Sequence, residues 1–482
     1  MNLAEYASYD ALGLAELVAN KQVSPKELAK TAVAAKEKID PTIRSVVELY
    51  PDRIDGLDEK SLGNGPFRGV PFLIKDVFGH EKGRKIEFGS RLCEGMTVEA
   101  DTHFAELLRA SGVNILGRSA APEYSMSSTT ESVMFGNTSN PWKQGYSAGG
   151  STGGGQAAVL AGIVPIAHGS DIGGSIRIPA SWCGGVGLKP SRMRVSSGPV
   201  VDEGGWGYSM NFVQTRTVRD AAAMLDCVAI PQPGDPFIIP KPDEPYAALA
   251  KRAPGRLKVG IVLDELVGMK VDPEVAAAVE ATGKALAGMG HAVERASADM
   301  GGREALVAAF DVFFFGFDAR LDAYAKRTGQ KPGPTTLEPV ILAVYEAAKE
   351  ITPARFIAAV NAANKARRKL GAFFGKYDIW LSPTTSRVAE PWGRYHLSRQ
   401  VGGWDDMIEQ LFKPPCQYTV PHNIMGTPAM SLPLAMHSTG VPIGVQIAAK
   451  PAADHLVLQL AAQLEQAMPW KARVPPLHVS KM

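Results

Sequence analysis

The sequence predicts an α/β protein, in which one large domain has a mixed, mostly parallel central sheet covered by helices on both faces. The main observation is that helical and strand patterns alternate, as is typical of parallel sheets covered by helices. A helical pattern over 103–111 precedes a short apolar strand at Val113–Leu116, and another over 156–162 precedes Val164–Ala167. The length of 482 residues allows a core of this size, and no internal repeat is visible.

The N-terminal part, residues 1–60, is expected to be helical. Ser24-Pro25-Lys26-Glu27 combines a capping serine, a first-turn proline and a glutamate at the third helical position, so it predicts the start of a helix. Gly69–Asp76 (GVPFLIKD) follows as a short buried strand that is apolar until its last two residues. It opens a core region at about 61–230 that contains most of the motifs.

The second half of the chain differs in composition from the first. Six prolines between Ile230 and Pro245 predict a linker over 230–254 rather than a packed element. Residues from about 265 to 376 are predicted to form a helical excursion, and those from about 386 to 422 an irregular segment that covers a cleft. The remaining patterns predict strands or helices at Leu257–Leu263, 273–289, Tyr377–Leu381, Met430–Pro433, Pro442–Ile447 and 454–467.

Composition and charge exclude several classes of protein. The net charge is +2 with both signs interspersed, so no basic stripe indicates a nucleic-acid partner. No apolar run approaches the roughly 18 residues that a membrane span needs, and no signal peptide is visible. The four cysteines have no metal-binding spacing, which favours reduced thiols in a cytoplasmic protein without a metal site. Monomer and homodimer both remain open.

Two glycine-serine turns, 24 residues apart, offer the clearest chemistry. They are Gly149–Gly154 (GGSTGG) and Asp171–Arg177 (DIGGSIR). The second turn follows a predicted strand, and the sites of α/β proteins lie at the carboxyl ends of strands. Gly173 and Gly174 let consecutive backbone amides point into one spot beside the Ser175 hydroxyl. This arrangement is suited to acyl transfer, because the amides stabilise the oxyanion as it forms.

A serine nucleophile needs a base, and Lys75 is the candidate. Lys75 ends the apolar run Phe72-Leu73-Ile74, where burial would disfavour its charged form. Ser151 is then placed to pass a proton between Lys75 and Ser175. Asp76 is adjacent to Lys75, so strand alternation turns it to the other face. No histidine lies in either turn, and the nearest one, His168, belongs to the preceding strand.

Each motif can also be explained without a catalytic role. A glycine-rich run is often a tight helix start, and a lysine after an apolar strand is often a surface terminus. Gly149–Gly155 lacks the lysine of the GxxxxGK[ST] phosphate loop. Gly149–Gly153 matches the GxSxG motif of α/β-hydrolases, but that motif needs a strand directly before the serine, and Pro141–Tyr146 is predicted to be a loop. The catalytic interpretation rests on all three pieces occurring together.

In these motifs the chain resembles the amidase signature family. The residues that carry the resemblance span essentially the whole chain and are Gly69–Asp76, Gly149–Gly154, Gly169–Ala180 (GSDIGGSIRIPA), Cys183–Pro190 (CGGVGLKP), Gly426–Pro433 (GTPAMSLP) and Gly440–Ile447 (GVPIGVQI). The resemblance implies the fold of that family and a Ser–cis-Ser–Lys triad. In it Ser175 is the acylated nucleophile, Ser151 is the proton relay beside a cis peptide bond, and Lys75 is the general base. No cofactor and no metal are implied.

The resemblance further implies an oxyanion hole formed by the backbone amides of Ile172, Gly173, Gly174 and Ser175. Two positions depart from the pattern of many members. Thr152 stands where a second serine is common and keeps a hydroxyl. Ile172 stands where a small hydroxyl residue is common, which leaves the amide intact and makes the pocket wall more apolar.

Around Ser175 the chain is most similar to broad-specificity bacterial amidases such as 6-aminohexanoate-cyclic-dimer hydrolase. This resemblance implies hydrolysis of small-molecule secondary amides (aryl amides, anilides or nylon-type oligomers) through an acyl-enzyme, with carbamates (urethanes) and esters as further substrates. Ile172 and Ile178 favour an apolar or aryl acyl group. We expect substrate contacts at Met126, Ser127, Gly150 and Ile178. The loops near Met126–Ser128, the Phe310–Phe317 cluster and the 386–422 cover are further candidates, although core packing is the favoured interpretation of the phenylalanines.

Two alternatives remain open. The amide-hydrolysing subunit of a glutamyl-tRNA amidotransferase has a similar pattern and length, and it would require partner chains and tRNA. A catalytically silent binding protein of the same fold is the second alternative. The intact Lys75, Ser151 and Ser175 argue against it.

Overall fold

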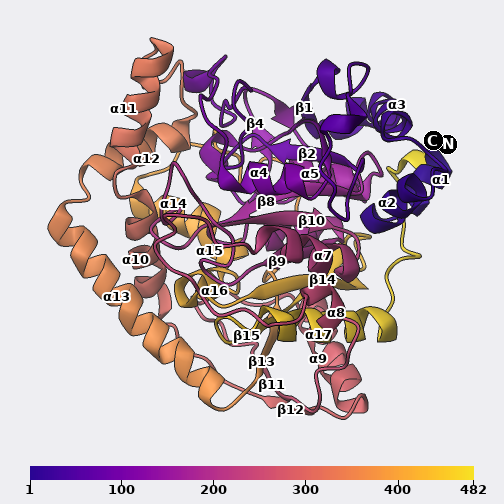
Figure 1. Cartoon of the computed structure of the whole chain (residues 1–482). Coiled ribbons are helices and arrows are strands. Elements are labelled where there is room, and N and C mark those ends of the chain that lie inside the picture. Colours follow the sequence, from indigo (N-terminus) through magenta and orange to yellow (C-terminus); the bar gives the residue numbers. More distant parts are fainter.

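The strands that hold the motifs lie in one 11-stranded sheet that crosses the middle of the molecule (Figure 1). The computed structural model describes residues 1–482, except for the side chain of Lys413. The strand order is β1-β3-β2-β8-β10-β9-β14-β15-β13-β11-β12. The bounds are β1 Val46–Leu49, β2 Pro71–Lys75, β3 Asn114–Ser119, β8 Ile166–Asp171, β9 Val186–Lys189, β10 Met210–Thr215, β11 Lys258–Ile261, β12 Ala292–Arg295, β13 Ile379–Pro383, β14 Ala429–Met436 and β15 Pro442–Ala449.

The sheet is mixed, as predicted, but its parallel pairs are confined to the two flanks. β2 pairs in parallel with β3 and β8, and β11 pairs in parallel with β13 and β12. From β8 through β10, β9, β14 and β15 to β13, every pair is antiparallel. The expectation that most pairs are parallel therefore fails in the centre. One reason is that the short turn 437–441 joins β14 to β15, and short connections join antiparallel neighbours.

Helices cover both faces of the sheet, and alternation along the strands assigns residues to each face. On β13, Ile379 and Leu381 belong to a core shared with α9 (Pro273–Gly288) and α17 (Asp454–Ala467). Trp380, between them, belongs to a second core shared with the helices of residues 302–371. Because successive side chains of a strand point to opposite faces, one sheet supports both cores.

The first half of the chain follows the predicted order of elements. α3 begins with the predicted capping box, in which Ser24 and Glu27 each accept a hydrogen bond from the backbone of the other. The two predicted helix–strand units are α4–β3 and α5–β8, although both strands extend further than expected. The helices of this half are α1 Leu3–Ser8, α2 Ala11–Ala19, α3 Pro25–Ile43, α4 His103–Ala110, α5 Gly153–Leu160, α6 Arg177–Cys183 and α7 Val218–Val228.

Helices dominate the second half outside the sheet. The proline-rich segment 230–245 has no regular element before α8 (Tyr246–Leu249). Four helices then flank the sheet at one end of the molecule (Figure 1): α10 Gly302–Phe314, α11 Phe317–Thr328, α12 Pro339–Lys349 and α13 Pro353–Gly371.

Residues 386–422 are only partly irregular, contrary to the prediction. After residue 403 the chain forms α14 (Trp404–Met407), a π-helical turn (Ile408–Phe412), α15 (Lys413–Cys416) and α16 (Val420–Met425). Pro414 lies in the first turn of α15. A proline is tolerated there because the missing N–H has no partner within the helix.

Two short hairpins and the two chain ends complete the fold. β4 (Glu131–Ser132) pairs with β5 (Gly136–Asn137), and β6 (Ser139–Asn140) pairs with β7 (Lys143–Ser147). β7 corrects the prediction of a loop at Pro141–Tyr146, because these residues pair with β6 outside the main sheet. Both chain ends lie at the same side of the molecule (Figure 1). Among the described helices, none combines the length and the apolar composition that a membrane crossing requires.

Candidate active site

Lys75 lies at the end of β2, and its amine points into a group of hydroxyls. The Nζ atom donates hydrogen bonds to Ser151 Oγ at 2.7 Å, Ser170 Oγ at 2.9 Å and Thr152 Oγ1 at 3.1 Å. The side chain is only 1% exposed. The prediction that Lys75 and Ser151 come together therefore agrees with the geometry, and Ser170 is an additional partner.

Burial lowers the affinity of the Lys75 amine for its proton. Removal from water lowers the pKa of Lys75 to about 7, although the nearby charge of Asp171 opposes the change. Around neutral pH a large fraction of the amine is thus uncharged and able to accept a proton. Asp76 does not contribute, because its carboxylate accepts hydrogen bonds from Arg118 and from the backbone amides of Glu87 and Gly89.

Ser151 stands in a tightly packed turn that leads into α5. The peptide bond between Gly150 and Ser151 is cis, as the resemblance implied. Thr130 holds the turn from outside, since its hydroxyl donates to the Gly149 carbonyl at 3.0 Å and accepts from the Gly153 amide at 2.9 Å. A Cβ atom at Gly150 would come within 2.4 Å of the Thr129 backbone. Only glycine fits this close approach.

Ser175 occupies the turn after β8, and Asp171 organises that turn. The Asp171 carboxylate accepts hydrogen bonds from the Gly174 amide at 2.8 Å and the Ile176 amide at 3.2 Å. It also forms a paired ion contact with Arg177, at 2.9 and 2.8 Å. Burial alone would raise the pKa of Asp171, but the charge and hydrogen bonds of Arg177 outweigh it and hold the pKa at about 2.

The Gly174 amide corrects one part of the predicted oxyanion hole. Because this N–H already donates to Asp171, it is not free to meet an oxyanion. The sequence could not reveal this hydrogen bond, because the Asp171 carboxylate folds back onto the turn that follows its own strand, β8. Ile172, Gly173 and Ser175 remain candidates for oxyanion donors, and all three line a pocket beside the turn.

Only the first half of the predicted proton path is formed. Among the described residues, no hydrogen bond joins Ser175 Oγ to Ser151 Oγ, whereas the Thr152 amide donates to the Ser175 carbonyl at 3.3 Å. Hydrogen bonds of catalytic groups are often absent without substrate and form in the complex. The backbone therefore links the two turns directly, through Thr152 and Ser175.

The pocket beside Ser175 is small and largely aromatic. Its volume is about 80 Å³. Of the predicted substrate contacts, Met126, Ser127 and Ile178 line it, and Gly150 does not, because Gly150 is packed against Thr129. The other lining residues are Phe78, Tyr124, Ser125, Ser128, Ile172, Gly173, Phe310, Phe313, Phe314, Phe317, Arg320, Phe412 and Cys416.

The aromatic cluster of α10 and α11 lies both in a core and at the pocket. Phe310, Phe313, Phe314 and Phe317 are buried in the second core and also line the pocket. Phe315 lies outside the pocket and stacks on Phe356, with ring centroids 4.2 Å apart. Core packing and substrate contact are therefore not exclusive for these side chains.

Comparison with known proteins decides the family. The amidase family model matches residues 27–458, which include Lys75, Ser151 and Ser175. The chain belongs to the amidase family. A 6-aminohexanoate-cyclic-dimer hydrolase of Paenarthrobacter ureafaciens is 36% identical, over 97% of this chain and 96% of that protein. An acylamidase of Rhodococcus erythropolis is 30% identical, over 96% of this chain and 96% of that protein.

A solved structure agrees with this assignment. The structure of 6-aminohexanoate cyclic dimer hydrolase complexed with substrate superimposes with a TM-score of 0.93 and 35% identity, and covers 98% of this chain and 99% of that one. The amidase is therefore an enzyme of the class that hydrolyses amide bonds, built on a single large α/β domain.

Several residues around the site escaped the sequence analysis of this amidase. Ser170 is the third hydrogen-bond acceptor of Lys75, and it lies near the end of β8, the strand that pairs with β2. Its position on the strand, one residue before Asp171, was only a weak indication that Ser170 belongs to the site. Arg320 reaches the pocket from α11, where no local motif marks it, whereas Phe412 and Cys416 belong to the 386–422 segment that the sequence had already marked as a candidate for substrate contact.

Proposed function

We propose that this amidase cleaves secondary amides through an acyl-enzyme on Ser175, with Ser151 as proton relay and Lys75 as general base. One observation carries the proposal: a buried amine with a pKa of about 7 lies 2.7 Å from Ser151 Oγ. His168 is a poor alternative base. Burial and the charge of Lys75 lower the pKa of His168 to about 3, and its Nδ1 accepts the Lys75 amide at 3.2 Å.

In the acylation step, Ser175 Oγ bonds to the amide carbonyl carbon while its proton passes to Ser151, and the Ser151 proton passes to the neutral Lys75 amine. The resulting oxyanion is stabilised by the amides of Ile172, Gly173 and Ser175. Cleavage of the C–N bond expels the amine, which takes up the proton returned by Lys75 through Ser151. Water then repeats the sequence on the acyl-enzyme, releases the carboxylic acid and restores Ser175.

The pocket lining supports an apolar or aryl acyl group. Ile172, Ile178 and four phenylalanines of α10 and α11 line the space beside Ser175. Such walls bind hydrocarbon through burial and offer few partners to the polar side chain of glutamine. We therefore favour aryl amides, anilides and nylon-type oligomers over a role in a tRNA-dependent amidotransferase. Carbamates and esters present the same carbonyl carbon to Ser175 and belong to the proposed range.

Arg320 adds one charged group to this pocket. It lies over the Phe317 ring, with its guanidinium carbon 5.8 Å from the ring centroid. No aspartate or glutamate lines the pocket, and no described carboxylate lies within 4.0 Å of Arg320. An acyl chain that ends in a carboxylate would find a counter-ion here. Arg320→Gln should then lower kcat/KM for an adipic acid mono-anilide about tenfold more than for hexananilide.

The primary test is hydrolysis of hexanoyl 4-nitroanilide by the purified protein. Ser175→Ala should lower kcat/KM by at least about 10⁴-fold, as expected when a nucleophile is removed. Ser197→Ala, outside both turns, is the matched control and should keep the activity. If Ser175→Ala hydrolyses the anilide at the wild-type rate, the nucleophile assignment is wrong. A panel of primary amides, anilides, lactam oligomers and aryl carbamates then ranks the substrate classes.

A further inference from the structure

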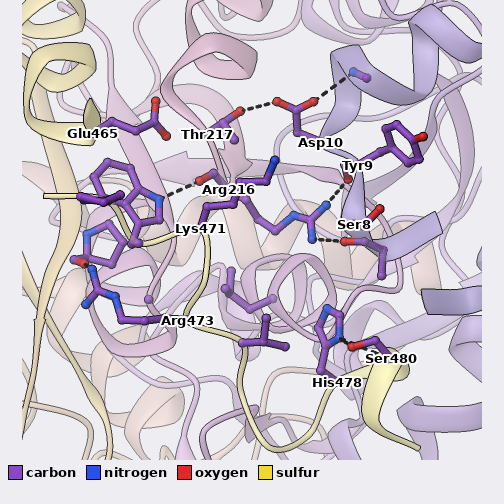
Figure 2. A pocket seen from close by; sticks show the side chains of 18 of the residues that line it. Ser8, Tyr9, Asp10, Arg216, Thr217, Glu465, Lys471, Arg473, His478 and Ser480 are labelled. Atoms are coloured by element: carbon purple, nitrogen blue, oxygen red, sulfur yellow. Dashed lines mark hydrogen bonds between the residues drawn. The ribbon is translucent and has the colours of Figure 1, made fainter. Parts of the chain in front are cut away.

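A second and much larger cavity lies away from the catalytic pocket. Its volume is about 990 Å³, and it shares no lining residue with the pocket at Ser175. Sites for small organic ligands commonly measure about 300–1,000 Å³. Its lining comes from α1 and α2, the turn from β10 into α7 and the C-terminal segment 469–480, together with Trp142, Leu160, Gly184, Pro433, Met436, Pro442 and Glu465. In Figure 2 Arg216 extends toward Ser8 and Tyr9, and Lys471 and Arg473 come from the C-terminal segment.

The side chains that line the cavity carry more positive charge than nearby carboxylates compensate. Arg219 is paired with Asp10 through two hydrogen bonds and lies 3.7 Å from Glu16, an exposed carboxylate that also lines the cavity. Arg216 instead donates to the carbonyls of Ala7, at 2.6 Å, and Tyr9, and its Nε is buried without a partner. Arg473 donates to the Pro433 carbonyl at 2.6 Å. Across the described side chains, no carboxylate lies within 4.0 Å of Arg216, Lys471 or Arg473.

The nearby acids supply only partial compensation. Burial raises the pKa of Glu465, which lines the cavity, to about 7, and it raises the pKa of Asp220, behind Arg216, to about 7 as well. Both carboxyls therefore keep a proton part of the time at neutral pH. Burial lowers the pKa of His478 to about 4, so this ring adds no charge. A buried guanidinium that meets only carbonyl groups gains from a ligand anion, because charge-assisted hydrogen bonds are the stronger ones.

The rest of the lining is apolar and selects the body of the ligand. Trp142 and Trp470 both face the cavity, with Pro433, Pro442, Pro469 and Met436. The indole N–H of Trp142 donates to the Cys183 carbonyl at 2.7 Å, and that of Trp470 to the Arg216 carbonyl at 2.9 Å. Because the protein already satisfies both N–H groups, the two rings offer a ligand only apolar surface.

We infer that this cavity is a second ligand site for an organic monocarboxylate with an aromatic or alkyl body. The carboxylate binds at Arg473 and Lys471, with Arg216 adding positive charge, and the body lies against Trp142 and Trp470. Amide hydrolysis produces carboxylic acids, so ligands of this class form where the enzyme works. The site itself does not depend on the reaction at Ser175.

Binding of 4-phenylbutyrate to the full-length protein at pH 7.5, measured by titration calorimetry, tests the site. We expect saturable one-to-one binding, at least fivefold weaker binding of the uncharged 4-phenyl-1-butanol, and at least fivefold weaker binding of the acid to Arg473→Gln. Arg252→Gln is the matched control, because Arg252 is an exposed arginine paired with Glu244 at 2.7 Å. It should bind as the wild type does. Lys471→Gln, on an exposed side chain, repeats the test if Arg473→Gln does not fold.

Location is tested with crystals soaked in 4-(4-bromophenyl)butyrate. An anomalous bromine peak beside Trp142 and Trp470 supports the inference. A peak found only beside Phe313 overturns it, because the acid then binds in the catalytic pocket. Equal affinity for acid and alcohol, equal affinity of Arg473→Gln and wild type, and inorganic phosphate that competes as strongly as the acid each overturn it too.

Discussion

Lys75 and Lys189 are two buried lysines whose pKa values are lowered alike but whose neighbours differ. Each is 1% exposed, and burial lowers the pKa of each to about 7. Lys75 donates to three hydroxyls at the Ser175 site, whereas Lys189, at the end of β9, donates to the carbonyl of Pro190 at 2.8 Å. The comparison teaches that a lowered pKa does not make a base by itself. A base also needs a hydroxyl that can deliver a proton.

The largest expected effect separates the two lysines by activity. Lys75→Met should lower kcat/KM for the anilide about 10³-fold, because general base catalysis typically contributes about 10² to 10⁴. Lys189→Met should keep most of the activity, since replacing a buried charge by an apolar side chain is often neutral for the fold. Steady-state kinetics on both variants measures this. An equal loss in both would show that burial, and not the hydroxyl contact, is what matters.

The dependence of activity on pH sharpens the same contrast. The Lys75 amine accepts a proton only when it is neutral, so kcat/KM should be level above its pKa and fall as pH drops through about 7. Below that point we expect about a tenfold loss per pH unit, as for one titrating base. Lys189→Met should show the same profile as the wild type. A flat profile from pH 6 to 9 would contradict a titrating lysine at the site.

Stability should depend on both lysines alike. Their pKa values are about 7 in the folded protein and about 10.4 in the unfolded chain. Between these limits the unfolded state binds more protons, so the free energy of unfolding rises with pH by up to about 1.4 kcal/mol per unit for each lysine. Urea denaturation at several pH values should give a shallower rise for Lys189→Met. An unchanged slope would mean that Lys189 titrates normally.

The smallest expected effect concerns the hydroxyls around Lys75. Thr152→Val removes one acceptor, at 3.1 Å, and keeps the shape of the side chain. The loss of one hydrogen bond of roughly 1 kcal/mol should lower kcat/KM about fivefold. Thr152→Ser is the control and should remain close to the wild type. A wild-type rate for Thr152→Val would show that Ser151 and Ser170 suffice.

The sequence placed the three predicted catalytic residues in short motifs with their own glycines or apolar strand, and the structure brings Lys75 and Ser151 together. The helix–strand units α4–β3 and α5–β8 were predicted because each is local in the chain. The sequence did not reveal that the Gly174 amide is occupied by Asp171, because that contact depends on how the turn closes. Nor did it reveal Arg320, which reaches the pocket through tertiary packing alone, whereas Phe412 lies in the predicted 386–422 cover. The antiparallel centre of the sheet was missed because most of its pairing partners lie far apart in the chain, although the short turn between β14 and β15 was a local sign of one antiparallel pair.

The neighbouring chain ends have a consequence for engineering. The backbone amide of Val479 donates to the Ala161 carbonyl at 3.0 Å, and Lys38 donates to the carbonyl of Met482. A short linker from residue 482 to residue 1 would therefore close the backbone into a ring at a modest entropic cost. New ends opened in the irregular segment 230–245 would leave every strand of the sheet intact. Circular permutation at that segment should yield a folded enzyme with the same strand neighbours.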